Sequence, residues 1–345
     1  MKVITKEHFD SFINRLIRDD DREVVGVQEK GNRYAFDRLR DAGDLRLDYD
    51  VTILPPKKYF LPPREILLKF KRGRDLSMAA VNRVVPRIII GVHPYDLVAI
   101  RQLDKVFRST YADQHYLKKR EASVLVGVNI QNTSEWSFAG SMGTATVDDG
   151  YDLMLTDIGD RYAVEVGSSK GSKLLASADA IVEDASPEDV ARVERHRETV
   201  QDMFEKTLDF SPRELPWLLR KNYGNMEFWE EHAELCYSCG TCNLVCPTCY
   251  CFDVLDRMEL NMAEGRRYRQ WDGCLLEKFA AVAGGENFRE RKAERYRHRY
   301  MRKGRYIYNR FGDIACVGCG RCSSQCVPDI ADPARIFNLL KEETP

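Results

Sequence analysis

Cysteines are concentrated in two short runs near the end of this 345-residue chain. Residues 236–246 and residues 316–326 both follow the spacing C-x2-C-x2-C-x3-C. Bacterial two-cluster proteins bind [4Fe–4S] clusters with this spacing. A zinc site needs four ligands, which often come as separated pairs, whereas each run offers four thiols within eleven residues. The runs therefore predict two [4Fe–4S] clusters and a protein that transfers electrons.

The spacing also predicts which cysteine binds which cluster. In two-cluster proteins of this type, the fourth cysteine of a run binds the other cluster. The expected ligands are Cys236, Cys239, Cys242 and Cys326 for cluster 1, and Cys316, Cys319, Cys322 and Cys246 for cluster 2. The alternative assigns all four thiols of one run to one cluster. Because distant segments share each cluster, we expect this region to fold only around its metal.

Three cysteines lie outside the two runs, namely Cys249, Cys251 and Cys274. One interpretation is that they are buried thiols, which pack like small hydrophobic side chains. A second is a third metal site, iron–sulfur or zinc, for which Asp272 or His298 has the right chemistry to be the fourth ligand. A third is a redox-active thiol pair in the Cys-Tyr-Cys segment. The sequence leaves these three interpretations open.

A basic segment precedes the second run. Residues 289–310 contain ten lysines and arginines interleaved with four tyrosines. They fit a solvent-exposed helix face, or a cationic surface that compensates the anionic clusters or docks an acidic partner. Positive charge close to a cluster raises its reduction potential. The formal net charge of −1 gives no reason to expect a nucleic acid as partner.

The overall composition is that of a soluble globular protein, with 43% hydrophobic and 31% charged residues. No apolar stretch approaches the ~20 residues that a membrane span needs. Residues 1–9 have no apolar core of a secretory signal, and eleven cysteines without such a signal fit metal ligands in a reducing compartment better than disulfides. We therefore expect a cytoplasmic protein without a membrane span.

The distribution of cysteines also indicates the domain organisation, because residues 1–210 contain none. We expect an α/β or α+β scaffold and docking domain over residues 1–210 and a [4Fe–4S] dicluster domain over residues 211–345. In the first domain, the short branched segments 87–92 and 123–128 predict buried strands. Residues 96–107 have the apolar spacing of a helix, and residues 151–166 that of a hairpin.

Further elements are expected around the domain boundary and between the runs. Ser186-Pro187 predicts a helix start, with the helix continuing to about residue 208. The prolines of segment 55–63 favour an extended arm, which either docks on a partner subunit or lies over its own domain. The two runs are separated by 69 residues rich in helix formers, for example residues 252–263. This favours a mainly helical, ferredoxin-like two-cluster domain.

Several further segments are distinctive, and they are residues 53–60, 91–93, 141–144, 166–171, 246–251, 282–285, 287–289 and 297–300. With these segments the chain resembles, over nearly its whole length, the β subunit of cytoplasmic sulfhydrogenases, the group 3b NAD(P)-linked [NiFe] hydrogenases. The resemblance implies a non-catalytic electron-transfer subunit of a soluble oxidoreductase complex. Its partners would be a flavin- and NAD(P)-binding subunit and the small and large [NiFe] subunits. The alternative is a catalytic iron–sulfur reductase of a sulfur compound that uses Cys249, Cys251 and Cys274.

The chain departs from the family pattern at three positions in the first domain. Family members often carry cysteines where this chain has Tyr95, Ser137 and Ala139. The joint loss of the three thiols is the result expected if they form one site. We therefore expect no iron–sulfur centre in the first domain, and a catalytic subunit other than a hydrogenase is a second option for the partner.

Overall fold

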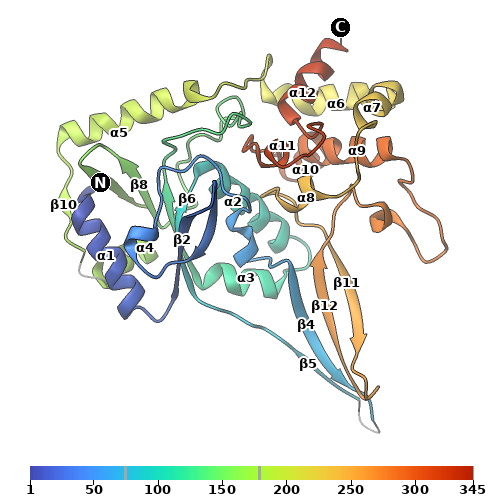
Figure 1. Cartoon of the computed structure of the whole chain (residues 1–345), viewed down its shortest axis with the longest axis horizontal. Helices are drawn as coiled ribbons and strands as arrows, with labels where there is room; N and C mark the ends of the chain where they lie inside the picture. The colour runs from blue at the N-terminus through green and yellow to red at the C-terminus, as the bar shows by residue number, and fades with distance from the viewer. Residues whose placement is uncertain (74–75, 178–179, 345) are drawn as a thin grey trace.

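A mixed sheet forms one end of the molecule in the computed structural model, which describes residues 1–73, 76–177 and 180–344 (Figure 1). Its strand order is β10-β1-β9-β8-β7-β6-β2-β3. The strands are β1 (Lys2–Thr5), β2 (Glu23–Lys30), β3 (Arg33–Arg38), β6 (Arg87–Val92), β7 (Ser123–Val128), β8 (Leu153–Asp157), β9 (Arg161–Val166) and β10 (Glu183–Asp184).

The helices are distributed along the whole chain. They are α1 (Lys6–Asp19), α2 (Pro94–Arg108), α3 (Gln114–Glu121), α4 (Ser169–Ser177), α5 (Pro187–Thr199), α6 (Leu215–Lys221), α7 (Met226–Ala233), α8 (Thr241–Leu244), α9 (Lys292–Met301), α10 (Ile307–Phe311), α11 (Arg321–Ser324) and α12 (Pro333–Glu342). A π-helical turn, Arg302–Tyr306, joins α9 to α10. No helix in the described residues has both the length and the apolar character needed to cross a membrane.

The centre of the large sheet is parallel and buried. Strands β2, β6, β7 and β8 pair in parallel, and Ile89 on β6 lies opposite Leu125 on β7. Side chains on both faces of β6 and β7 are buried, as expected for short runs of branched apolar residues. The predictions for both strands, for helix α2 and for the β8–β9 hairpin are confirmed.

A second sheet projects from the body as an arm, as Figure 1 shows. It consists of β11 (Phe252–Met258), β12 (Glu264–Trp271), β4 (Arg64–Lys71) and β5 (Ser77–Ala80), in that order. Strands from both halves of the sequence therefore form one sheet.

Residues 252–263 are rich in helix formers but do not form a helix. Seven residues from Phe252 to Met258 pair with β12 instead, and β12 pairs in turn with β4. Helix propensity is a weak preference, and the backbone hydrogen bonds of a three-strand pairing override it here. The C-terminal region thus combines short helices with a hairpin that the expectation of a mainly helical domain had missed.

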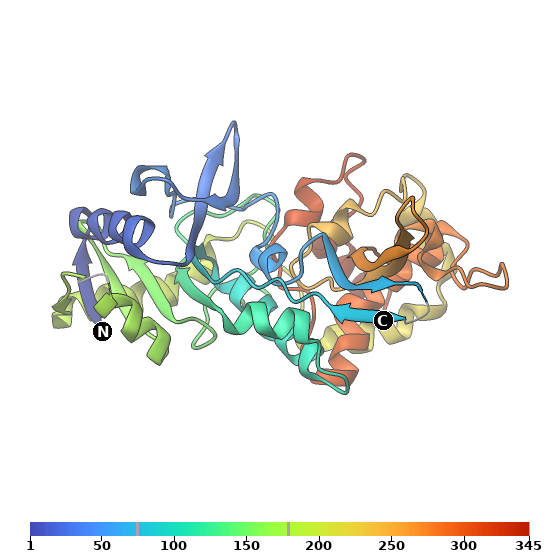
Figure 2. The ribbon, with the colours of Figure 1, turned by 90° about the horizontal axis from the view of Figure 1, so that it is seen from below.

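The helices of the C-terminal region lie at the end opposite the large sheet, also when the molecule is seen from below in Figure 2. Their shared core includes Trp229 on α7, Tyr300 on α9 and Phe337 on α12, all fully buried. Aromatic residues from three helices thus share a core with cysteines of both runs.

The structure corrects the expected end of one helix and decides between the two interpretations of the proline-rich segment. Helix α5 has the expected start, where Ser186 and Asp189 form a capping box, but it ends at Thr199 and only a 3-10 turn, Val200–Met203, follows. The proline-rich segment is no free arm, because Phe60 and Leu61 within it are fully buried in the chain's own core. Of the two interpretations of this segment, the structure supports packing on its own domain.

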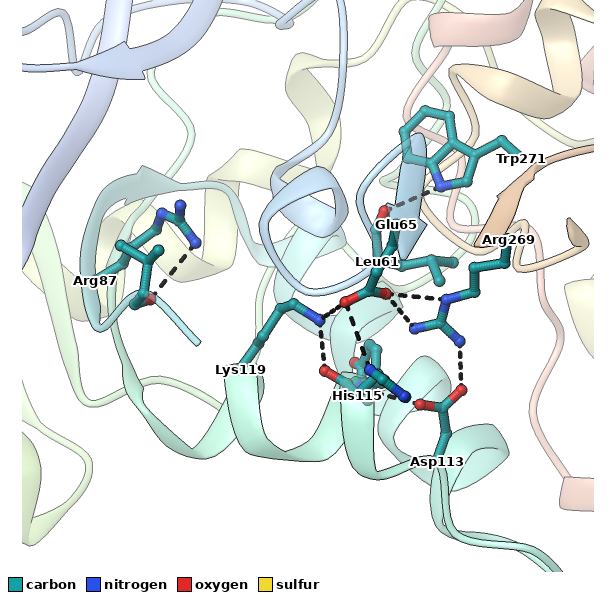
Figure 3. A network of polar contacts seen from close by, with 10 residues as sticks. Leu61, Glu65, Arg87, Asp113, His115, Lys119, Arg269 and Trp271 are labelled. Atoms are coloured by element: carbon teal, nitrogen blue, oxygen red, sulfur yellow. Dashed lines mark hydrogen bonds and ion pairs between the residues drawn. The ribbon is translucent and has the colours of Figure 1, made fainter. Parts of the chain in front are cut away.

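A buried ionic network attaches the arm to the large domain (Figure 3). Glu65 on β4 accepts hydrogen bonds from Arg269 on β12, at 3.0 Å from Nε and 2.8 Å from Nη2, and it pairs with Lys119 on α3. Arg269 also pairs with Asp113, which caps α3. The side chains of Glu65, Arg269 and Lys119 are all less than one-tenth exposed. One carboxylate therefore links two strands of the arm to a helix of the first domain.

We expect Glu65→Gln to lower the free energy of unfolding by about 1–3 kcal/mol, because two buried cations lose their shared anion. The loss stays moderate, since Arg269 keeps Asp113 and Lys119 keeps the carbonyl of His115. Chemical denaturation of the metal-loaded chain measures it. Glu264→Gln is the matched control, because Glu264 forms an exposed pair with Lys71 on the same two strands. An equal loss of unfolding free energy in the two variants would show that the buried network stabilises the fold no more than an exposed ion pair does.

Candidate iron–sulfur site

The two cysteine runs have the same backbone conformation. In the first run, Ser238 and Gly240 have positive φ angles of 52° and 75°, and in the second run Gly318 and Gly320 have φ angles of 67° and 74°. Each run then enters a one-turn helix, α8 or α11, that carries its third cysteine. Positive φ angles curl a loop tightly. Both loops therefore curl in the same places, between the first and third cysteines of each run.

The four thiols expected to bind cluster 2 lie together. Cys316, Cys319 and Cys322 each interact electrostatically with Cys246 of the first run. Burial raises the pKa of all three thiols, that of Cys319 to about 12. Thiols with a raised pKa are protonated at neutral pH, and they become ligands only when a metal displaces the proton. The donor set fits an iron–sulfur cluster in chemistry and in its burial.

The thiols expected to bind cluster 1 are arranged more openly. Cys236 and Cys242 are buried and interact with each other, and burial raises the pKa of Cys242 to about 12. Cys326 is half-buried and packs against the hydrophobic core that contains Cys236 and Cys242. Cys239 lies at the surface. The donor set again fits a cluster, and one of its members faces solvent.

The three remaining cysteines line a cavity with a volume of about 20 Å³. Asn243 donates its amide to Cys274 Sγ at 3.4 Å and to Cys249 Sγ at 3.8 Å, and Cys251 completes the group. Of the two candidate fourth ligands, Asp272 lines this cavity, whereas His298 packs its ring against Tyr306.

The arrangement of these groups does not resemble a site for one metal ion. In the described residues, no three His, Cys, Asp or Glu side chains lie close enough to bind a single ion. The thiolates of a cubane bind different iron atoms and stand farther apart than the ligands of one ion, so this observation concerns zinc rather than iron–sulfur clusters. It leaves the zinc form of a third site without geometric support.

Four buried cations surround the thiols, and these are the functional residues that sequence reasoning identified least well. Arg299 on α9 and Lys303 in the π-helical turn belong to the basic segment, which thus points part of its charge inward. Arg321 lies inside the second run and is fully buried. Lys57, in the proline-rich segment, had given no signal except its position between prolines.

Lys57 contacts the backbone at the end of the first run and just beyond it. Its ammonium group donates to the carbonyl oxygens of Cys246 at 2.6 Å and Cys249 at 2.9 Å. Burial lowers the pKa of Lys57 to about 8 even though both neighbouring thiols raise it. The two carbonyl oxygens and the Trp271 ring, whose centroid lies 4.5 Å from the ammonium nitrogen, offset part of the cost of burying this charge, and a nearby anion would offset more of it. A bound anionic cluster supplies such a negative charge.

Cys246 is the thiol most ready to act as an anion. A hydrogen bond from Cys249, together with the ammonium groups of Lys303 and Lys57, holds the pKa of Cys246 well below its ordinary value. Lys303 also donates to Thr248 Oγ1 at 2.7 Å, and Thr248 donates to the carbonyl oxygen of Ala315 at 2.7 Å. These contacts hold the end of the first run against the start of the second.

We expect Lys57→Met to make the reduction potential of the cluster bound by Cys246 more negative by roughly 50–100 mV. The reason is that a buried positive charge in contact with the Cys246 backbone favours the reduced state of that cluster. Titration of the metal-loaded chain, followed by electron paramagnetic resonance (EPR), measures the shift. Lys58→Met is the matched control, since the ammonium group of the neighbouring Lys58 donates to the carbonyl oxygen of Phe36 and not to the cysteine segment. An unchanged potential in the Lys57 variant would show that its charge does not act on the cluster.

The three positions at which the chain lacks family cysteines lie around the second run. Tyr95 and Ala139 share a hydrophobic cluster with Cys319, and Ser137 donates to the carbonyl oxygen of Gly318 at 2.9 Å. Their proximity agrees with the interpretation that thiols at these positions would form one site. In this chain a phenol, a hydroxyl and a methyl group stand there.

Comparisons with known proteins agree with this site. The family described as 4Fe-4S dicluster domain matches residues 235–330, which include both cysteine runs. The sulfhydrogenase 2 subunit beta of Pyrococcus furiosus is 34% identical over 336 residues, covering 96% of this chain and 94% of that protein. The likeness thus extends over both halves of the fold and not only over the cysteine runs. The chain belongs to the family of sulfhydrogenase beta subunits and contains a 4Fe-4S dicluster domain.

Proposed function

We propose that the chain is the electron-transfer subunit of a multi-subunit cytoplasmic oxidoreductase. Two [4Fe–4S] clusters would relay electrons between a flavin- and NAD(P)-binding subunit and a second redox module, of which a [NiFe] hydrogenase is one form. The observation that carries the proposal is the pair of cysteine loops with positive φ angles at equivalent positions, whose one-turn helices α8 and α11 pack together. Clusters held by these adjoining loops would lie near each other, as electron transfer between them requires.

The proposed ligand sets are those predicted from the spacing. Cluster 1 is held by Cys236, Cys239, Cys242 and Cys326, and cluster 2 by Cys316, Cys319, Cys322 and Cys246. The electrostatic contact of Cys246 with all three other members of its set supports the crossed assignment. The protein supplies thiolate ligands and buried positive charge, and the clusters when bound supply one-electron redox chemistry.

The proposed division into residues 1–210 and 211–345 separates the part without cysteines from the part that holds the clusters. The two parts are closely joined, because β11 and β12 pair with β4, and Arg321 in the second run bonds with Asp96 on α2. Positioning of the clusters by the first domain is consistent with its proposed role as a scaffold.

A third iron–sulfur centre at Cys249, Cys251 and Cys274 extends the proposal. Support comes from the grouping of the three thiols with Asp272 and from the cations beside them, Arg299, Arg302 and Lys303; a cluster, like a substrate, would have to widen the cavity of about 20 Å³ between them. Quantification of iron decides, since about eight irons per chain corresponds to two cubes and about twelve to three.

Reduction of a sulfur compound at these thiols is the competing function. The cavity is large enough for about one water molecule, so a substrate would have to open it. If the triple variant with serine at Cys249, Cys251 and Cys274 keeps both its cluster spectra and the turnover of the complex, the catalytic hypothesis is excluded.

Purification of the tagged chain under anaerobic conditions tests the electron-transfer proposal. We expect co-purifying subunits with flavin and further redox centres, and we expect NADPH or NADH to reduce the clusters in that complex. A chain that purifies without any redox subunit, or clusters that no nicotinamide donor reduces in the complex, would contradict the proposed partners.

A further inference from the structure

A basic cavity lies where the arm joins the body of the molecule. Its volume is about 470 Å³, within the range of roughly 300–1,000 Å³ that is usual for small-molecule sites. Its walls come from β4, from the segment before β4, from the segment between β5 and β6, and from α3. The charged side chains that line it are Lys58, Arg64, Glu65, Arg83, Arg87 and Lys119. Among the described residues, five cations thus share this cavity with one carboxylate, and Figure 3 labels Glu65, Arg87 and Lys119.

Two of the five cations have an anion within the protein. The buried Lys119 pairs with Glu65, which also binds Arg269. Arg87 Nε lies 2.5 Å from a carboxylate oxygen of Glu23, a residue outside the lining. The charges of Lys119 and Arg87 are therefore compensated before any ligand binds.

The other three cations, Lys58, Arg64 and Arg83, form no ion pair with a described residue. Burial lowers the pKa of Lys58, whereas the charge of Asp37 raises it. Asp37 is itself paired with another lysine, at 3.0 Å. Arg64 holds its guanidinium group 4.1 Å from the centre of the Tyr268 ring, which orients the side chain without neutralising it. Three positive charges in the lining thus lack a paired anion.

The lining indicates the chemistry of a ligand. Positive charges that line one cavity repel one another, so an anion that binds between them is stabilised. The guanidinium group of arginine matches the oxygen atoms of phosphate with paired N–H donors. One phosphate group carries about −1.5 to −2 charges at pH 7, so two linked phosphates bring about the charge that three cations lack. Ile66, Val81 and Val85 add an apolar wall, on which the organic part of a ligand can pack.

We propose that this cavity binds a small molecule that carries a diphosphate group. Lys58, Arg64 and Arg83 hold the phosphates, and the apolar wall favours an organic diphosphate over the inorganic ion. Because the walls belong both to the arm and to the body, the bound molecule links the two. The inference depends neither on the ligand sets of the clusters nor on electron transfer through the chain.

Isothermal titration calorimetry of the metal-loaded full chain tests the site, with ADP, inorganic diphosphate and adenosine as probes. At about 0.15 M salt, exposed charges act over no more than about 8 Å, which suppresses unspecific binding. We expect both diphosphates to bind, and adenosine to bind about tenfold or more weakly than ADP. A higher affinity for ADP identifies an organic diphosphate as the ligand, whereas equal affinities identify the inorganic ion. Failure of both to bind would overturn the proposal, and so would a hexaglutamate peptide that binds as tightly as ADP, because the cavity would then fit an acidic protein segment.

The double variant Arg64→Met and Arg83→Met tests whether the cavity is the place of binding. Both side chains are exposed, so their loss should leave the fold intact. The affinity for ADP should fall about tenfold or more. The matched control is Lys69→Met with Arg72→Met, which removes two exposed cations on β4 and directly after it, outside the lining.

Thermal unfolding of the same three proteins gives a second readout. A ligand that binds the folded state raises its unfolding temperature. ADP should therefore raise the unfolding temperature of the wild type and of the control variant, but not that of the cavity variant. Equal affinities for ADP in the two double variants would mean that ADP binds elsewhere, and the proposal would be wrong.

Discussion

Replacement of Cys246 by serine is expected to remove cluster 2 and retain cluster 1, so that the iron content falls from about eight to about four per chain. The reason is the position of this thiol, which interacts with Cys316, Cys319 and Cys322 although it belongs to the first run. Iron quantification and EPR spectra of the anaerobically purified chain measure the outcome.

The EPR signals of variants in other ligands test whether Cys246 binds the cluster of the second run. Cys246→Ser and Cys319→Ser should leave the same residual EPR signal, whereas Cys236→Ser and Cys326→Ser should share the other one. If Cys246→Ser instead resembles Cys236→Ser, each run holds a whole cluster and the crossed assignment is wrong. Because cluster binding and folding are coupled, we also expect the single-cluster variants to unfold at lower temperature than the wild type.

The second large effect is expected at the buried ion pair that joins the second cysteine run to α2. Arg321 Nη1 lies 2.7 Å from Asp96 Oδ1 and Nη2 lies 2.6 Å from Oδ2, and neither side chain is exposed. Arg321 also donates to the carbonyl and the hydroxyl oxygen of Thr52, both at 2.8 Å. Arg321→Met should lower the free energy of unfolding by about 3–5 kcal/mol, because it leaves a buried carboxylate without a partner.

Two further variants separate the ion pair from general effects of substitution. The double variant Asp96→Leu and Arg321→Met should recover much of the stability, since no unpaired charge stays buried. Arg267→Met removes an exposed partner of Asp256 and should cost about 0–1 kcal/mol. Chemical denaturation of the metal-loaded chain measures all three. A loss in Arg321→Met no larger than in Arg267→Met would show that the pair does not stabilise the fold.

The parts of the fold that follow from local sequence were predictable. Strands 87–92 and 123–128 consist of branched apolar residues, and this pattern has few other outcomes. Residues 252–258 were misjudged because their pairing partners, β12 and, beyond it, β4, lie elsewhere in the chain. A long-range contact of this kind leaves no signal in the local propensity.

The candidate site, too, was predictable only where it depends on local sequence. The spacing of the thiols identified the two runs, because each loop is a local structure. Lys57 lies 189 residues before Cys246, the residue whose carbonyl it contacts, and no pattern in either segment indicates the other. Arg299 and Lys303 were noticed as members of a basic segment, but which of its charges point inward depends on the packing of α9 against α7.

We expect this chain to conduct electrons through two [4Fe–4S] clusters. A redox titration of the purified complex, followed by EPR from the potential of its donor to that of its acceptor, measures the oxidation states of both. Two [4Fe–4S] signals should appear and disappear reversibly within this range. Clusters that keep one oxidation state throughout the range would instead hold the fold together without carrying electrons, and electron transfer through this chain would be excluded.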